Sequence, residues 1–296
     1  MSNAFLPGLA FRAFLIATLT VVPFARGALK LWNGSVNGNW STPGNWVGNV
    51  APVAGDELVF QGPPVTRLLV TNDFSPNRAF TSLTFQGSNY FVRGNSLLLS
   101  NGITSVNAVG ANHIDADVNV RGSQFWEATG SLGVLDVNGD INLNANTLTV
   151  RANTGDFFFS GIISGAGNLV KTNVGTLRLD GAGNNTYAGF TRFDGGVLEL
   201  AKFQVVPTPA TFTVIPGDLT VGDGNALPQT DVLRLLADDQ IADSSDVTVK
   251  NSGLFDLNNH SDRIGSLTLQ GAWSGPAPAN SFWVATSARW RTRPPR

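Results

Sequence analysis

The chain has 296 residues, of which 14% are charged and 33 are glycine, and its formal net charge is −2. Ordinary soluble domains carry about 25% charged residues and about 7% glycine, so this composition argues against a large charged helical surface. The weak net charge gives no basic field for phosphate backbones or anionic lipids, so we expect neither nucleic acid nor a membrane surface as partner. Cysteine is absent, which excludes disulfides, thiolate nucleophiles and Cys-ligated zinc.

The N-terminus has the pattern of an export signal. Arg12 precedes an apolar run from Ala13 to Phe24, and Ala25 and Gly27 have the −3 and −1 spacing of a signal-peptidase site. The run is shorter than the roughly 20 residues that span a bilayer. We therefore predict a removable signal at residues 1–27 and no transmembrane span after its removal; the alternatives are a hydrophobic first strand or an uncleaved anchor.

The first segment of the mature chain is rich in tryptophan. Trp32, Trp40 and Trp46 lie among glycines and asparagines, and the segment ends in the apolar residues before Gln61. The exposed end of a stacked β-structure needs a cover that prevents further strand addition. We predict an N-terminal cap at residues 28–60.

Residues 61–271 repeat one short unit, in which a Gly or Asn is followed by two apolar residues separated by one position. Alternation with period two places Leu177 and Leu179 on one face and Arg178 on the other, as in a half-buried strand. The copies begin at Asn95, Asn146, Gly175, Gly196, Gly217, Gly253 and Gly265, with a weaker copy at Thr81.

The spacing of these units predicts the fold. The starts at Gly175, Gly196 and Gly217 suit one coil of a solenoid, and the Gly, Asn and Asp residues around them allow the positive φ of sharp corners. A strand this short cannot bury its apolar face alone, so the copies must stack and share one core. We expect an all-β parallel β-helix, in which the segment from Val232 to Ile241 is ambiguous and is compatible with a helical turn.

The last segment, residues 272–296, loses the alternation and ends in arginines and prolines. Proline lacks the amide donor that a central strand needs. We expect this tail to be irregular and disordered, or a scar of premature termination.

Four stretches in the second half closely resemble the autotransporter-associated β-strand repeat. They run from Ile163 to Lys171, Gly175 to Leu179, Asn185 to Gly189 and Gly195 to Leu200. The resemblance is strongest over residues 160–270 and weaker from residue 31 onward. It implies a right-handed parallel β-helix passenger, secreted or displayed at a Gram-negative cell surface in association with the outer membrane.

The repeat itself has no catalytic residues to carry over, so the resemblance implies no enzyme. No series of about ten-residue alternating strands, as in an outer-membrane domain, follows the repeats. We therefore expect either a secreted passenger-like protein or a piece of a longer passenger.

Two acidic clusters contain the carboxylate pairs that acid/base catalysis would need. Asp115 and Asp117 are two residues apart on a predicted strand and would share its outward face, and Asp238 and Asp239 lie near Asp243. With no Arg or His assisting either cluster in the sequence pattern, we favour solvent-facing charges on a strand and a turn.

A triad-like tripeptide and two calcium-candidate turns are also better explained as structural features of turns. His260, Ser261 and Asp262 are the residue types of a nucleophilic triad, but sequence adjacency does not produce triad geometry. The turns Gly222–Asn225 and Asn138–Asp140 offer oxygen ligands for calcium, yet turn stabilisation explains them better. With His113 the only other histidine, a multi-His metal site is not expected. We predict no catalytic, cofactor-binding or metal-binding residues and no cofactor.

Exposed tryptophans would form sugar-stacking platforms, whereas buried ones would form an aromatic cap and ladder, which we favour. The residues concerned are Trp32, Trp40, Trp46, Trp126 and Trp273. The leading hypothesis is a non-enzymatic structural or adhesion module whose polar flank binds a polysaccharide or another surface protein. The alternative is a β-helix polysaccharide lyase or glycosidase, which requires Asp115, Asp117 and Arg121 or Arg151 to converge beside Trp126.

Overall fold

The computed structural model describes residues 27–203, 213–225, 227 and 230–271. The predicted export signal lies outside these residues except for Gly27, and the predicted tail at 272–296, with Trp273, lies outside them entirely. The described residues form 23 strands and one three-residue 3-10 helix, η1 (Pro43–Asn45). None of the helical structure in this part of the chain is long and apolar enough to cross a membrane.

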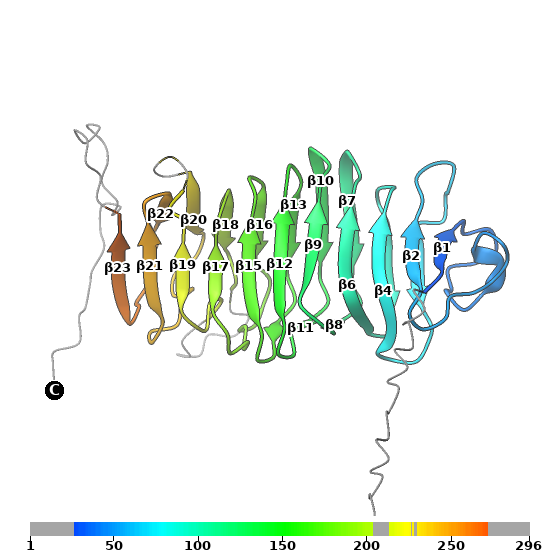
Figure 1. Ribbon diagram of the computed structural model, residues 1–296, viewed down its shortest axis with the longest axis horizontal. Helices are drawn as coiled ribbons and strands as arrows, with labels where there is room; N and C mark the ends of the chain where they lie inside the picture. The colour runs from blue at the N-terminus through cyan, green and yellow to red at the C-terminus, as the bar shows by residue number, and fades with distance from the viewer. Residues whose placement is uncertain (1–26, 204–212, 226, 228–229, 272–296) are drawn as a thin grey trace, which may run out of the picture.

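All the strands stack parallel in two long sheets, so the predicted parallel β-solenoid is confirmed (Figure 1). Along its main path the 14-stranded sheet, sheet A, contains β1 (Leu29–Trp32), β2 (Glu57–Phe60), β4 (Arg78–Phe85), β6 (Leu97–Ser105), β9 (Gln124–Ala128), β12 (Thr147–Ala152), β15 (Asn168–Thr172), β17 (Thr191–Phe193), β19 (Leu219–Val221), β21 (Asp246–Lys250) and β23 (Ser266–Gln270). The nine-stranded sheet, sheet B, contains β3 (Leu69–Asn72), β5 (Phe91–Gly94), β7 (Val109–Ile114), β10 (Leu132–Val137), β13 (Asp156–Phe159), β16 (Thr176–Leu179), β18 (Val197–Leu200), β20 (Asp231–Leu235) and β22 (Gly253–Asp256).

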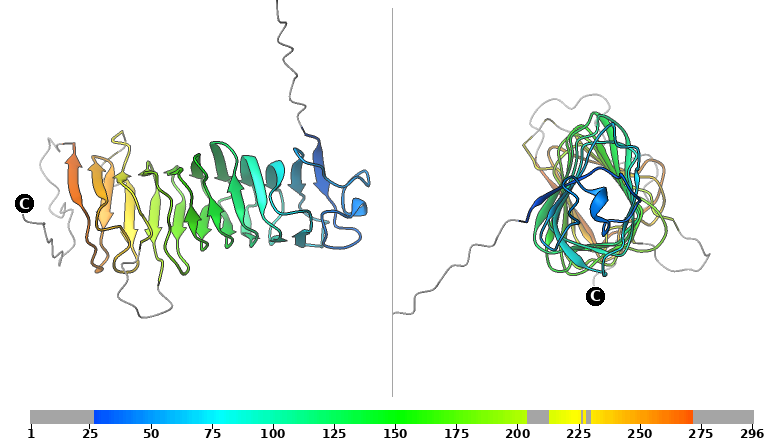
Figure 2. Two further views of the ribbon diagram at one scale, coloured as in Figure 1. Left: turned by 90° about the horizontal axis from the view of Figure 1, so that it is seen from below. Right: turned by 90° about the vertical axis from the view of Figure 1, so that its right-hand side faces the viewer.

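From β2 onward the chain alternates between a strand on the main path of sheet A and a strand of sheet B, with a corner at each crossing. In the middle coils the corner from sheet B to sheet A has short strands of its own, β8 (Val118–Val120), β11 (Ile141–Asn142) and β14 (Ile163–Ser164), which pair with one another along the axis. The end view in Figure 2 shows the closed outline that results. The segment from Val232 forms strand β20, so the helical reading of that segment was wrong.

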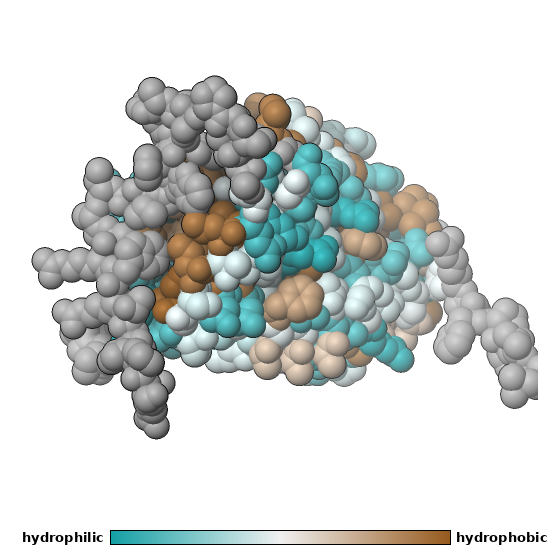
Figure 3. Space-filling model, turned by 60° about the vertical axis from the view of Figure 1, so that its left-hand side comes forward, coloured by the Kyte–Doolittle hydropathy of each residue, from teal (hydrophilic) through white to brown (hydrophobic). Residues whose placement is uncertain are grey.

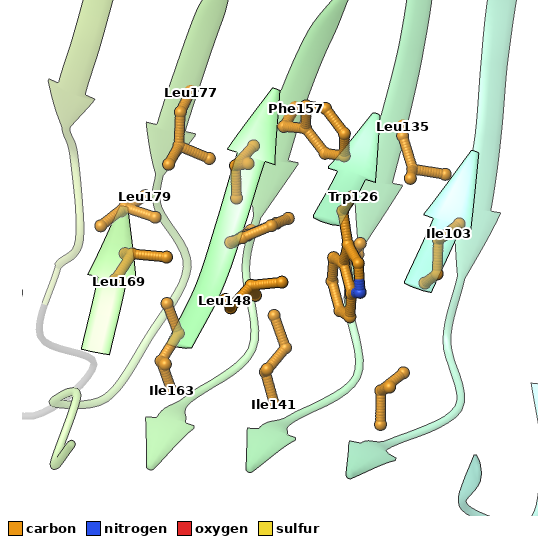
Figure 4. Packing of buried hydrophobic residues seen from close by; sticks show 14 of the residues in the cluster. Ile103, Trp126, Leu135, Ile141, Leu148, Phe157, Ile163, Leu169, Leu177 and Leu179 are labelled. Carbon is orange, nitrogen blue, oxygen red and sulfur yellow. The ribbon is translucent and has the colours of Figure 1, made fainter. Parts of the chain in front are cut away.

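The core lies between the two sheets and is built from ladders of identical or similar side chains. In sheet B, Leu135, Phe157, Leu177 and Leu198 occupy one register position in successive strands, and all four are buried. Figure 4 shows side chains from both sheets pointing into this interior. Each such residue contributes about 1.5–3 kcal/mol when it is fully removed from water, which a single short strand could not achieve alone.

The corners use residues that tolerate a left-handed backbone, as the sequence predicts. Asn144, Asn173 and Asp239 have φ values of 52°, 69° and 53°. Side chains at these corners also link successive coils. The Asp117 carboxylate accepts the amide of Asp140 at 2.9 Å, and the Asp140 carboxylate accepts the amide of Ile162 at 2.8 Å. The corner carboxylates thus satisfy backbone donors that the sheets leave unpaired.

The tryptophan-rich segment covers the N-terminal end of the core, where η1 lies across the opening (Figure 2). Trp32, Trp40 and Trp46 are fully buried and surround the ring of Phe60, with centroid distances of 6.2, 5.6 and 6.3 Å. The loop outside them is held by buried Asn45. Its side-chain oxygen accepts the amides at positions 36 and 37, and its side-chain nitrogen donates to Oδ1 of Asn37 and the carbonyl of Asn39.

Candidate functional site

The outer face of sheet B presents one continuous row of side chains along the solenoid, which we call the sheet-B ladder. Backbone register aligns its members, one from each strand. From the N-terminal side they are Leu69, Phe91, His113, Asp136, Phe158, Arg178, Glu199, Arg234 and Asp256. The row changes from apolar and aromatic at its start to alternating charges at its end.

Contacts within the sheet-B ladder run along the axis from coil to coil. The rings of Phe91 and His113 stack with centroids 4.3 Å apart, and Nδ1 of His113 lies 2.9 Å from Asp136. Burial raises the pKa of Asp136, although the hydrogen bond and charge of His113 oppose this. Arg234 contacts Asp256 at 2.9 Å. Ion pairs near the protein surface contribute only about 0–1 kcal/mol each, so these contacts add little to the stability of the fold.

The structure corrects the placement of Asp115 and Asp117. They lie in the turn between β7 and β8 and not on a strand, because the chain leaves sheet B after Ile114 and buries Ala116 between them. Both are exposed. The Asp115 carboxylate accepts a hydrogen bond from Asn138 at 2.8 Å, and Asp117 caps the amide of Asp140. Their oxygens therefore connect neighbouring coils.

The arrangement required by the enzyme alternative does not form. Trp126 is fully buried and its indole points into the core (Figure 4). Arg151 lies instead on the outer face of sheet A against Phe125. Trp32, Trp40 and Trp46 are buried as well, in agreement with the expected aromatic cap and ladder. The four described tryptophans thus offer no exposed sugar-stacking face.

The polar side chains of the two calcium-candidate turns form hydrogen bonds within the turn and to neighbouring coils. Asp223 accepts the amide of Asn225 at 2.7 Å and the hydroxyl of Ser252 at 3.2 Å. Asn138 and Asp140 are engaged with neighbouring coils as described above. Within the described ranges, three or more His, Cys, Asp or Glu residues do not gather in a metal-holding group.

The acidic cluster near the C-terminal end and the triad-like tripeptide come together at one place, which we call the C-terminal corner. It comprises the turn after β20, with Asp238, Asp239 and Asp243, and the turn after β22, with His260 to Arg263. Nδ1 of His260 lies 3.2 Å from Asp238, and Arg263 contacts Asp243 at 3.3 Å. The expectation that no Arg or His assists this cluster was therefore wrong, because stacking brings residues of consecutive coils side by side.

Triad geometry is not formed at the C-terminal corner. The contact of His260 is with Asp238 of the preceding coil, and Asp238 also accepts the amide of Ser261 at 2.8 Å. The Asp262 carboxylate instead accepts the amides of Gln240 and Ile241 at 2.8 and 3.1 Å. These contacts fasten one coil to the next.

Asp262 is the most perturbed carboxyl of this corner. One oxygen accepts the two amides, while the other is buried without a hydrogen-bond partner. Burial raises the pKa of Asp262 to about 7, and the nearby charge of Asp239 adds to the effect. Because the native pKa of Asp262 exceeds its unfolded value, the native protein binds this proton more tightly than the unfolded chain does. The free energy of unfolding therefore falls as pH rises from about 4 to about 7.

Asp262→Asn is expected to change the free energy of unfolding differently at pH 8 and at pH 4. The change at pH 8 is expected to be more stabilising by about 1–3 kcal/mol. The asparagine oxygen retains the two amide contacts, and the uncharged side chain removes the cost of burying an anion. Thermal unfolding followed by circular dichroism at the two pH values measures this difference. Equal effects at pH 4 and pH 8 would contradict a buried, neutral Asp262.

The sequence interpretation missed two buried lysines. Lys171 is 1% exposed, and its ammonium donates to the carbonyls of Thr172, Asn173 and Gly195 at 3.2, 2.6 and 2.5 Å. Lys202 is also 1% exposed and donates to the carbonyl of Gly161 at 2.9 Å. Burial lowers the pKa of Lys171 to about 7 and that of Lys202 to about 8.

Comparison with known proteins agrees with the resemblance noted in the sequence. Residues 169–200, which include Lys171, match the passenger-associated-transport-repeat family. A stretch of 114 residues, 38% of this chain, is 33% identical to an adhesin autotransporter, BmaC, of Brucella suis biovar 1 (strain 1330). That match covers 3% of the relative's length. No solved structure matches the chain significantly. Both matches support an autotransporter passenger-like repeat in the matched part of the chain.

Proposed function

We propose that this chain is a non-enzymatic adhesion passenger, exported and presented at the surface of a Gram-negative bacterium, where the outer faces of the solenoid bind a polysaccharide or a surface protein. The observation that carries the proposal is the sheet-B ladder. Its members lie in one register position over nine successive strands, so they form an extended row of exposed and partly exposed groups.

The surface composition supports contact with a polar partner. Figure 3 shows hydrophilic residues over much of the visible flank, with a hydrophobic patch beside the C-terminal end. Non-obligate interfaces are about as polar as the rest of a protein surface. Repeated weak contacts to one ligand also raise its overall affinity, because later contacts form within the same complex. A rod with repeated polar rows suits an elongated ligand that makes many weak contacts.

The full chain, immobilised on beads, is expected to make the beads adhere to host cells or to polysaccharide-coated surfaces. The test variant replaces Arg178 and Arg234 of the sheet-B ladder by glutamine. The control variant replaces Arg263, an ion-paired arginine outside the ladder, by glutamine. Adhesion that falls with the first variant and persists with the control supports the proposal. Adhesion absent from wild-type beads, or progressive cleavage of the captured polysaccharide, would contradict it and favour the enzyme.

A further inference from the structure

One arginine on the outer face of sheet A, Arg151, stacks on an exposed aromatic ring, whereas several other outward arginines are paired with carboxylates. Arg178, Arg192, Arg234 and Arg263 each lie within ion-pair distance of a carboxylate. The guanidinium of Arg151 has no carboxylate within that distance in the described part of the chain. It lies instead 3.5 Å above the ring centroid of Phe125, which is 48% exposed.

The nearest candidate partner of Arg151 is occupied. Glu127 is its register neighbour in the preceding coil, but Oε1 of Glu127 accepts a hydrogen bond from Asn153 at 2.7 Å. Asn173, one coil further on, donates in turn to Asn153. One oxygen of the Glu127 carboxylate is thus held in a chain of amides, and the guanidinium of Arg151 makes no hydrogen bond or ion pair within the described residues.

Arg151 lies among outward-facing polar side chains and one aromatic ring. In register with it lie Thr104, Glu127 and Thr172, and the adjacent row contains Phe125 and Thr149. Stacking on an aromatic ring fixes the plane of a guanidinium, so less conformational entropy is lost when its donors engage a ligand. The planar fork of donors matches a carboxylate in a bidentate arrangement.

We infer that the outer face of sheet A binds a carboxylate-bearing polysaccharide, with one sugar carboxylate on Arg151. Charge complementarity selects an anion. Strand β9 pairs on both sides, with β6 and β12, so the backbone offers no edge to an added peptide strand. Recognition must therefore use the side-chain hydroxyls, amides, guanidinium and ring, which suit a sugar chain. This inference rests on the proposed adhesive function and names a ligand class for a second face of the solenoid, opposite the sheet-B ladder.

The test measures binding of the full chain to immobilised polygalacturonate, its methyl-esterified form and poly-glutamate. Arg151→Gln is compared with Arg192→Gln, whose arginine occupies the same face but is already paired with Asp194 at 2.7 Å. Wild type is expected to prefer polygalacturonate over the esterified polymer, and Arg151→Gln is expected to weaken that binding about tenfold to a hundredfold. Arg192→Gln is expected to bind like wild type.

The inference would be overturned if Arg151→Gln bound polygalacturonate like wild type, or if the two variants lost binding equally. Binding of wild type to poly-glutamate as strong as to polygalacturonate would also overturn it, because that result favours an acidic peptide. Circular dichroism melting of both variants separates loss of binding from loss of folding. If folded Arg151→Gln loses polygalacturonate binding, the inference holds. Adhesion of wild-type beads to cells without polygalacturonate binding would contradict the ligand class and leave the adhesive function standing.

Discussion

Phe60→Ala is expected to lower the free energy of unfolding by about 3–5 kcal/mol. The Phe60 ring is fully buried and packs against Trp32, Trp40 and Trp46 of the N-terminal segment. It also stacks on Phe85 in the next coil, at a centroid distance of 5.2 Å. Removing it creates a cavity where the N-terminal segment meets the solenoid, and neighbouring rings of this size cannot collapse fully into the space.

Denaturant unfolding followed by tryptophan fluorescence measures this loss, because three buried indoles surround the cavity. Phe190→Ala is the matched control, since Phe190 is 45% exposed and its truncation is expected to change stability by about 0.5 kcal/mol or less. Similar losses in the two variants would show that the tryptophan-rich segment is not packed on Phe60.

The second large effect concerns Lys171. Its native pKa is lowered to about 7, below the ordinary value of 10.5, because burial disfavours the ammonium; the charges of Asp156 and Asp231 oppose the shift. Between these pH values the unfolded chain binds more protons than the native protein, so stability is expected to rise as pH increases from about 7 to about 10. Lys202, with a pKa of about 8, contributes in the same direction.

Lys171→Met is expected to remove most of this rise and to lower stability at pH 10 by about 2–4 kcal/mol, because the carbonyls of Thr172, Asn173 and Gly195 lose their common donor. Below pH 7 the loss is expected to be smaller, since wild type then bears the cost of a buried charge. Denaturant unfolding at pH 6, 8 and 10 provides the comparison. A pH-independent difference between Lys171→Met and wild type would contradict a titrating buried lysine.

The strands could be predicted from the sequence, but their assignment to two sheets could not. Units beginning at Gly175 and Gly196 form the neighbouring strands β16 and β18 of sheet B, as their 21-residue spacing indicates. The unit at Gly217, spaced in the same way, forms β19 of sheet A. Alternation with period two marks which side chains face inward and is identical for both sheets, so it cannot distinguish them.

The sequence did hold a signal for the buried lysine. Lys171 has the same parity as buried Leu169 in strand β15, so the alternation itself assigns Lys171 to the interior. The residue type argues the other way, because lysine is almost never fully buried without partners. The partners are backbone carbonyls at a corner, one of them in the next coil, and no side-chain pattern in a single sequence reveals them.

At the C-terminal corner, in contrast, a contact between side chains could have been predicted from the sequence. Asp238 and His260 are separated by about one coil, and combining coil spacing with the positions of the charged residues would have paired them. Arg151 was noted only for an enzyme cleft beside Trp126. Its free guanidinium depends on Asn153 taking Glu127, a choice among hydrogen bonds that the sequence does not decide.

Spin-label distances along one outward row of sheet A test the in-register stack most directly. Because the chain has no cysteine, labels can be placed in pairs at will. Thr149, Thr220, Thr248 and Thr268 occupy one register position, with two coils between the first two. The stack predicts backbone separations of about 5, 10 and 24 Å for the pairs 220/248, 220/268 and 149/268. Distances that fail to increase by one rung per coil would contradict the solenoid and remove the extended faces on which the proposed adhesion depends.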